Sequence, residues 1–299
     1  MSDSSGINAL GIAAALASSF SWALGTVLLK TVGDGISSLA MTLAKGAISL
    51  VLIAVVLAFG GFSPMGAEAL LLLSLSGLLG IALSDTCFFE ALKDLGPLSL
   101  VLVLLLGQVA TVVFAVVFLG ERPSPAAWIG IGLVISGLGV VLTADLSGES
   151  RAGGLRGIAF GLVSLLSMAV STIIAKKALA DVSALQATFV RMAAGTLGIF
   201  ILGGTTGRLG AWMNPFADPR VATRFLLAAC VVTFGGFWLS LFAIQKLDVS
   251  LANTLIATEP VFVLPLAAIF LRERITGRAV AGTFVAVLGV VLLCLAGKA

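Results

Sequence analysis

The chain has 299 residues, of which 60% are hydrophobic and only 10% are charged, and its mean hydropathy is +1.20. Soluble domains average roughly 45–50% apolar and about 25% charged residues, so this composition excludes a water-soluble globular protein. The net charge of +3 comes without a basic tract. We therefore expect the lipid bilayer as a partner and no nucleic acid.

Ten apolar runs follow one another along the chain, each close to the 20 residues that a helix needs to cross about 30 Å of hydrocarbon. Backbone amides find no water in lipid, so the runs predict helices, and they lack the alternation of a membrane β-barrel. The predicted fold is all-α and integral to the membrane, with ten transmembrane helices over 9–30, 37–60, 68–92, 97–119, 126–144, 155–177, 184–204, 223–245, 250–271 and 278–297. We expect the first run to be a retained membrane helix rather than a signal peptide, because no basic segment precedes it.

The polar residues of the first run recur in the sixth. A shift of 146 residues places LASSFSWALGTVLLK (16–30) on LVSLLSMAVSTIIAK (162–176) without a gap. A shift of 152 places FLGER (118–122) on FLRER (270–274). These matches predict an internal duplication.

The predicted repeats comprise residues 1–148 and 152–299, with five helices each. Because five is an odd number, the second repeat must enter the membrane in the opposite direction to the first. Inverted repeats of this kind build a solute site at their interface, near the middle of the membrane, in many transporters.

Lys45 in the second span and Arg191 in the seventh occupy equivalent positions in the two repeats. Each lies about eight residues into its span, which is roughly 12 Å by helix rise. Either the two side chains extend to lipid phosphates, or they serve the solute pathway by contacting a carboxylate or forming a gate ion pair. Their repetition favours the pathway.

The third span carries Asp85, Phe88 and Phe89 on one face, at the i, i+3 and i+4 positions of a helix. An acid beside aromatic rings is suited to an amphiphilic solute, whose apolar part would pack on the rings. Ordinary helix or lipid packing is the alternative for each ring. Three further mid-span candidates for the pathway are Trp22, Gln108 and Trp238.

The ninth span contains the segment IATEPVFVLP, with Glu259 near its centre. A carboxylate at that depth costs about 2.5–3.5 kcal/mol unless it is neutral, paired or facing water. Glu259 is therefore either a proton-coupling or substrate-ammonium site, or a protonated side chain that hydrogen-bonds a neighbouring helix. Pro260 and Pro265 each remove a helix hydrogen bond and predict a hinge or a cavity wall.

The fifth and tenth spans differ from the others because they are rich in small residues and carry no charge. Gly132 with Ser136, and Gly282 with Ala286, are small-xxx-small pairs that permit close backbone contact. We expect these helices to be peripheral and to touch each other or a second subunit. The chain is then a monomer, or a weak dimer held through helices 5 and 10.

The ten-helix inverted duplication resembles the EamA-type drug/metabolite transporters. The residues that carry the resemblance are the basic residues early in helices 2 and 7 (Lys45, Arg191), E-P-V-F from Glu259, and G-E-R or R-E-R after helices 4 and 9. Within that family the chain looks most like the bacterial aromatic-amino-acid exporters. It departs from the family pattern in the fourth span, where Gly107-Gln108 aligns with Glu259-Pro260. The resemblance implies a multi-pass protein of a bacterial inner membrane with both termini inside, whereas the distribution of Lys and Arg over the loops favours both termini outside.

The chain has no histidine, and its three cysteines are scattered, so no catalytic Ser–His or Cys–His system, metal or cofactor is expected, and no enzymatic activity. No G-x-x-x-x-G-K-[ST] fingerprint for ATP occurs, so energy would come from a gradient. The leading prediction is a secondary transporter that exports small metabolites, above all amino acids including aromatic ones, by alternating access. The alternative is efflux of drug-like cations, and a channel or scramblase is less favoured.

Overall fold

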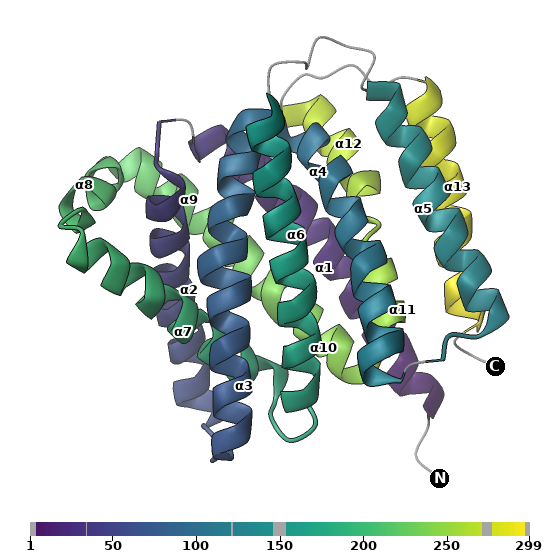
Figure 1. Cartoon of the computed structure of the whole chain (residues 1–299), viewed down its shortest axis with the longest axis horizontal. Coiled ribbons are helices and arrows are strands. Elements are labelled where there is room, and N and C mark those ends of the chain that lie inside the picture. Colours follow the sequence, from purple (N-terminus) through teal and green to yellow (C-terminus); the bar gives the residue numbers. More distant parts are fainter. Residues whose placement is uncertain (1–3, 34, 121, 146–153, 271–276, 297–299) are drawn as a thin grey trace.

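The computed structural model describes residues 4–33, 35–120, 122–145, 154–270 and 277–296, and these form a bundle of helices without a strand (Figure 1). The elements of the first half are α1 (Ser4–Gly33), α2 (Ser38–Gly60), α3 (Ala67–Gly77), the π-helix η1 (Leu78–Leu83), α4 (Ser84–Leu119) and α5 (Pro125–Asp145). Those of the second half are α6 (Gly154–Ala178), α7 (Ala184–Thr205), α8 (Leu209–Met213), the 3-10 helix η3 (Asn214–Ala217), α9 (Pro219–Cys230), the π-helix η4 (Val231–Trp238), α10 (Leu239–Lys246), α11 (Val249–Ile256), α12 (Glu259–Phe270) and α13 (Gly277–Ala296).

Seven helical segments in the described part of the chain are long and apolar enough to cross a membrane. They coincide with the predicted spans 1, 2, 3, 6, 7, 8 and 9. The predicted span 4 lies within α4, and α5 and α13 supply only shorter apolar stretches, 125–137 and 280–289. Ten separate spans are therefore not confirmed, although the fold is all-helical as predicted.

Two predicted non-helical connections are helical in the structure. Helix α4 continues through residues 93–96, which separate the predicted spans 68–92 and 97–119. The predicted loop around 204–222 contains α8 and η3. In both places the backbone is helical although the local residues favour turns. Helical hydrogen bonds satisfy backbone groups that find no water in lipid.

The second helix of each predicted repeat begins in the same way. Ser37 precedes α2 and accepts a hydrogen bond from the Ala40 amide, while Ser183 precedes α7 and accepts one from the Gln186 amide, both at 3.3 Å. A serine at this position satisfies an amide that the helix cannot. The shift of 146 residues relates the two caps.

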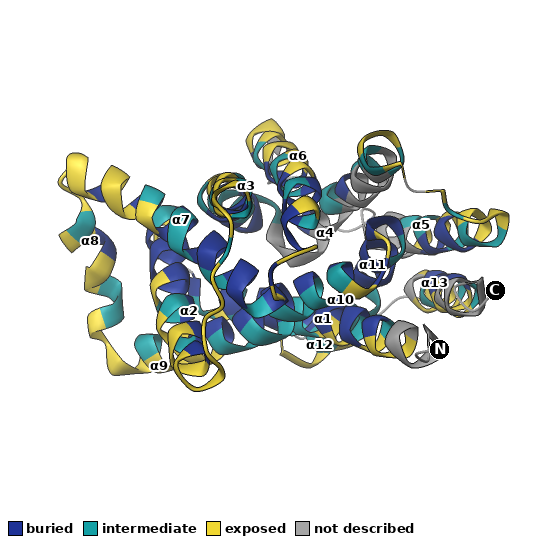
Figure 2. Ribbon diagram, turned by 90° about the horizontal axis from the view of Figure 1, so that it is seen from below, coloured by how far each residue is buried: buried dark blue, intermediate teal, exposed yellow. Residues whose placement is uncertain are grey.

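The outer surface of the bundle is apolar. Figure 2 shows exposed residues along the outer faces of the helices and buried ones between them. Large exposed side chains include Phe59, Leu71 and Ile269, which are 90%, 71% and 72% exposed. Such a surface is expected where lipid tails take the place of water.

Helices α5 and α13 pack against each other at one side of the bundle (Figure 1). A Cβ atom on Gly137 would overlap the backbone of Ala286, and one on Gly289 would lie 2.7 Å from the Val134 amide nitrogen. The two backbones therefore approach closely where small residues permit it. The predicted contact between these helices occurs within one chain.

Candidate functional site

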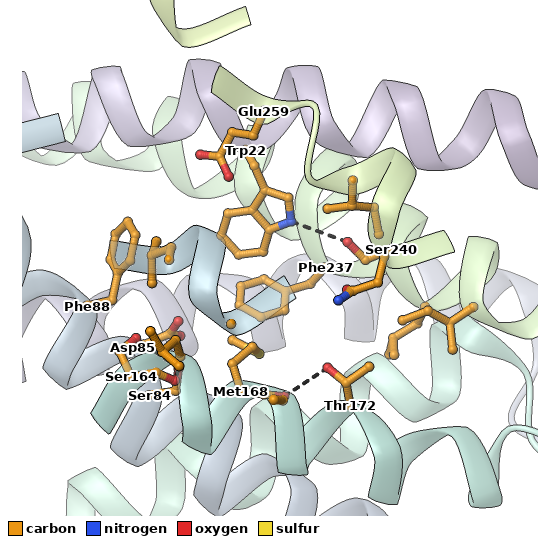
Figure 3. Close-up of a pocket in the computed structure, with 18 of the residues that line it drawn as sticks. Trp22, Ser84, Asp85, Phe88, Ser164, Met168, Thr172, Phe237, Ser240 and Glu259 are labelled. Carbon is orange, nitrogen blue, oxygen red and sulfur yellow. Dashed lines mark hydrogen bonds between the residues drawn. The ribbon is translucent and has the colours of Figure 1, made fainter. Parts of the chain in front are cut away.

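A cavity of about 150 Å³ lies inside the bundle. Side chains from α1, α4, α6, α7, η4, α10, α11 and α12 line it, so both predicted repeats contribute (Figure 3). At roughly 10–15 Å³ for each water position, the cavity has room for a small organic solute.

The residues that line the cavity occur in repeat-related pairs. The shifts of 146 and 152 residues relate Trp22 to Met168, Asp85 to Phe237, Phe88 to Ser240, Leu104 to Ile256, and Gly107 to Glu259. The cavity is therefore built from the same positions of both halves, with unlike side chains facing each other.

The helix contacts around the cavity are also repeated. The Ser18 hydroxyl donates to the Gly236 carbonyl at 3.0 Å, and the Ser84 hydroxyl donates to the Ser164 carbonyl at 2.9 Å. Ser18 and Ser164 are equivalent, as are Ser84 and Gly236. Each contact joins the first helix of one half to the third helix of the other, which places the cavity at the junction between the halves.

Lys45 and Asp85 form a buried ion pair. The Lys45 ammonium binds the Asp85 carboxylate, and the two side chains are only 2% and 6% exposed. The ammonium also lies 4.5 Å from the centre of the Phe237 ring, within range of a cation–π interaction. Asp85 lines the cavity, whereas Lys45 stands behind it.

Arg191 extends from α7 to the cavity and is 4% exposed. Its Nη2 donates to the Ser171 hydroxyl at 3.0 Å. A Cβ atom on Gly80, within η1, would lie 3.0 Å from this nitrogen, so a glycine there makes room for the guanidinium. The π-helices η1 and η4 overlap under the shift of 152, and such segments often mark functional sites.

Glu259 stands at a break in the ninth span. Helix α11 ends at Ile256, and α12 begins at Glu259 with Pro260 in its first turn. A proline is tolerated there because the first amides of a helix lack partners, and a carboxylate is favoured by the helix dipole. The Thr26 hydroxyl donates to Glu259 Oε1 at 3.3 Å, and the side chain lines the cavity.

Aromatic rings form part of the cavity wall. The Trp22 indole nitrogen donates to the Ser240 hydroxyl at 3.3 Å, and its ring meets Phe237 edge-on with centroids 4.7 Å apart. Phe88 faces the cavity from α4 (Figure 3). These rings offer an apolar surface beside the charged groups.

Of the residues proposed from the sequence for the solute pathway, five line the cavity: Trp22, Asp85, Phe88, Arg191 and Glu259. Phe89 is buried in the core against Phe88, and Trp238 packs against Phe234, neither being among the described lining residues. The side chain of Gln108 lies outside the described residues. Pro265 lies inside α12.

Sequence reasoning missed several lining residues. Met168, Ser240 and Asn253 carry no charge and sit among similar residues, so nothing local distinguishes them. The repeat shifts would have found the first two, because they are equivalent to the predicted residues Trp22 and Phe88.

One end of the cavity-forming helices is tied by side-chain hydrogen bonds. The Lys176 ammonium donates to the carbonyls of Ile244 and Leu247 at 2.6 and 2.9 Å, across the end of α10. Gln245 donates two hydrogen bonds back to the connection between α6 and α7. These contacts hold α6 and α10 together at this end.

The EamA-like transporter family model matches residues 9–143 and 155–295, once within each predicted repeat. The chain belongs to the EamA-like transporter family. One solved structure, described only as the crystal structure of a protein, has a TM-score of 0.73 with 18% identity, covering 98% of this chain and 99% of that one. That likeness shows a shared fold. No curated protein matched the sequence.

Family membership identifies a multi-pass membrane protein of a drug/metabolite transporter family, and a transporter rather than an enzyme. The two matches correspond to the two-repeat architecture of the family. Among the described residues, no group of three or more cysteines, aspartates or glutamates is placed to hold a metal ion.

Proposed function

We propose that the protein is a secondary transporter that exports small zwitterionic metabolites, above all amino acids including aromatic ones, across a bacterial inner membrane. The observation that carries the proposal is the composition of the cavity: a buried guanidinium and a carboxylate, Arg191 and Glu259, line it together with aromatic rings. A zwitterion with an apolar side chain presents the complementary groups.

Alternating access would come from movement of one repeat against the other around this cavity. The predicted inversion of the repeats supports such a movement, since the same contacts would then form at opposite faces. The chain lacks an ATP fingerprint, so a solute or ion gradient would supply the energy.

Efflux of drug-like cations is the second candidate, because Asp85 and Glu259 both line the cavity. However, Lys45 already neutralises Asp85, and Arg191 adds a positive charge to the wall. A cation would therefore meet one available carboxylate and one repelling guanidinium, which favours a zwitterion.

The test is transport by purified protein in proteoliposomes. Saturable flux of labelled phenylalanine that exceeds flux of a cationic dye is expected. Absence of phenylalanine flux with protein that is demonstrably folded would reject the proposal, and flux of the dye alone would favour cation efflux. Non-saturable flux would indicate a channel.

A further inference from the structure

The equivalent cations of the two halves, Lys45 and Arg191, have different surroundings. Lys45 and Arg191 occupy the same position of the two repeats, but among the described residues a carboxylate partner, Asp85, is found for Lys45 and none for Arg191. The residue equivalent to Asp85 in the second half is Phe237. The duplication therefore provides a counter-ion for one cation and a phenyl ring where the second counter-ion would be.

In the described part of the chain, Arg191 is consequently a buried cation without a carboxylate of its own. Within the described residues, no carboxylate lies at ion-pair distance from it, and its Nε has no hydrogen-bond partner. Asp85 lies in electrostatic range but is occupied by Lys45, so the two cations share a single acid. A charge buried in this way is strongly unfavourable unless a partner reaches it.

The cavity is where such a partner can approach, because Arg191 lines it. A guanidinium presents its N–H groups as a planar fork that matches the two oxygens of a carboxylate. Nη2 is engaged by the Ser171 hydroxyl, which holds the group in place, while Nε is unoccupied. Nε is itself buried, so a solute carboxylate would reach the guanidinium through the part of the side chain that lines the cavity.

We propose that Arg191 binds the carboxylate of the transported solute, which thereby supplies the counter-ion that Phe237 does not. This inference rests on the proposed function and names the recognition group for one end of the solute. Lys45 with Asp85 is an internal, neutral pair that does not contact the solute carboxylate.

The other end of a zwitterion is assigned by the same asymmetry. Glu259 stands where the first half has Gly107, and its hydrogen-bond donor in the structure is the Thr26 hydroxyl. The solute ammonium pairs with this carboxylate. Both recognition groups then belong to the second half, and the site with its zwitterion is neutral overall.

The first experiment compares three related probes on the full-length protein in detergent: phenylalanine, 3-phenylpropionate, which lacks the ammonium, and phenethylamine, which lacks the carboxylate. Binding is measured by titration and by thermal stabilisation. Arg191→Gln should weaken the binding of phenylalanine and of phenylpropionate by about 30-fold or more, since loss of a buried charge partner has effects of this size. Phenethylamine should bind at least as well as to the native protein.

Arg191→Lys is the folding control, because it keeps the charge and loses the fork. It should retain phenylpropionate binding with an intermediate affinity. If Arg191→Lys and Arg191→Gln both fold and bind all three probes as the native protein does, the assignment is overturned.

The second experiment restores the missing acid. Phe237→Asp places a carboxylate at the position equivalent to Asp85 and beside the Lys45 ammonium, so that two acids would serve the two buried cations. Phe237→Asn is the matched neutral control. The Asp variant should lose phenylpropionate binding relative to the Asn variant while keeping phenethylamine binding. Equal phenylpropionate affinity in the two variants would overturn the assignment.

The outcomes separate this inference from the proposed function. Phenylalanine flux with probe affinities independent of Arg191 would refute the carboxylate site and leave amino-acid transport standing. Phenylpropionate binding that depends on Arg191, without phenylalanine flux, would support the carboxylate site and reject zwitterions as the solute class.

Discussion

Replacing Asp85 by Asn would leave the Lys45 ammonium buried without its counter-ion. The side chains of this pair are 2% and 6% exposed, and Arg191 lies within electrostatic range and adds repulsion. Removing one partner of a buried pair costs about 3–5 kcal/mol, because the remaining charge keeps its desolvation penalty. We expect Asp85→Asn to reduce the free energy of unfolding by that amount, measured by SDS-induced unfolding in mixed micelles.

The chain offers a matched control in the exposed pair of Arg156 and Glu90, whose atoms lie 2.6 Å apart while the Arg156 side chain is 66% exposed. Glu90→Gln should cost only about 0–1 kcal/mol. The double variant Lys45→Met, Asp85→Leu should be close to native, because it removes both charges. If Asp85→Asn is as mild as Glu90→Gln, the buried pair does not exist as described.

Glu259, Gly46 and Lys176 each make a contact that a single substitution removes or disturbs. Glu259→Gln should reduce amino-acid flux by about tenfold or more, since a charged interaction of at least about 1.4 kcal/mol is removed. It should also flatten the pH dependence of flux, because the glutamine side chain does not titrate. An unchanged pH profile in proteoliposomes would make Glu259 a structural residue. Gly46→Ala should lower the free energy of unfolding by about 1–3 kcal/mol, because the new Cβ would overlap the Thr196 hydroxyl of α7. Gly60→Ala in the same helix meets open space and should be tolerated. Equal unfolding free energies for the two variants would refute this prediction. Lys176→Met removes two hydrogen bonds at the end of α10. It should increase the rate of thiol labelling of a cysteine placed in the α10–α11 turn. An unchanged labelling rate would show that these hydrogen bonds do not hold this end of the helices together.

The helical fold and its duplication were predictable because lipid imposes simple rules on a sequence. Apolar runs of sufficient length directly predict membrane-spanning helices. Seven helices in the described structure are long and apolar enough to span a membrane. Charged residues within apolar spans stand out, and this is why the sequence singles out Asp85, Arg191 and Glu259, all of which line the cavity.

The remaining features depend on contacts between segments that sequence patterns do not describe. Trp238 and Phe237 are adjacent aromatics, and only the packing of η4 against α1 decides that Phe237 reaches the cavity. The break before Glu259 falls at Ile256 rather than at the proline itself. Within the described residues, Lys45 is paired with a carboxylate and Arg191 is not, which follows from tertiary distances alone. The difference between Asp85 and Phe237 at equivalent positions of the repeats is visible in the sequence.

An experimental structure of the protein with phenylalanine bound tests the proposed solute site most directly. We predict that the solute lies in the cavity at the junction of the two halves, with its carboxylate on Arg191, its ammonium on Glu259 and its ring against Trp22 or Phe88. Phenylalanine bound elsewhere, or bound in this cavity with its carboxylate away from Arg191, would contradict it.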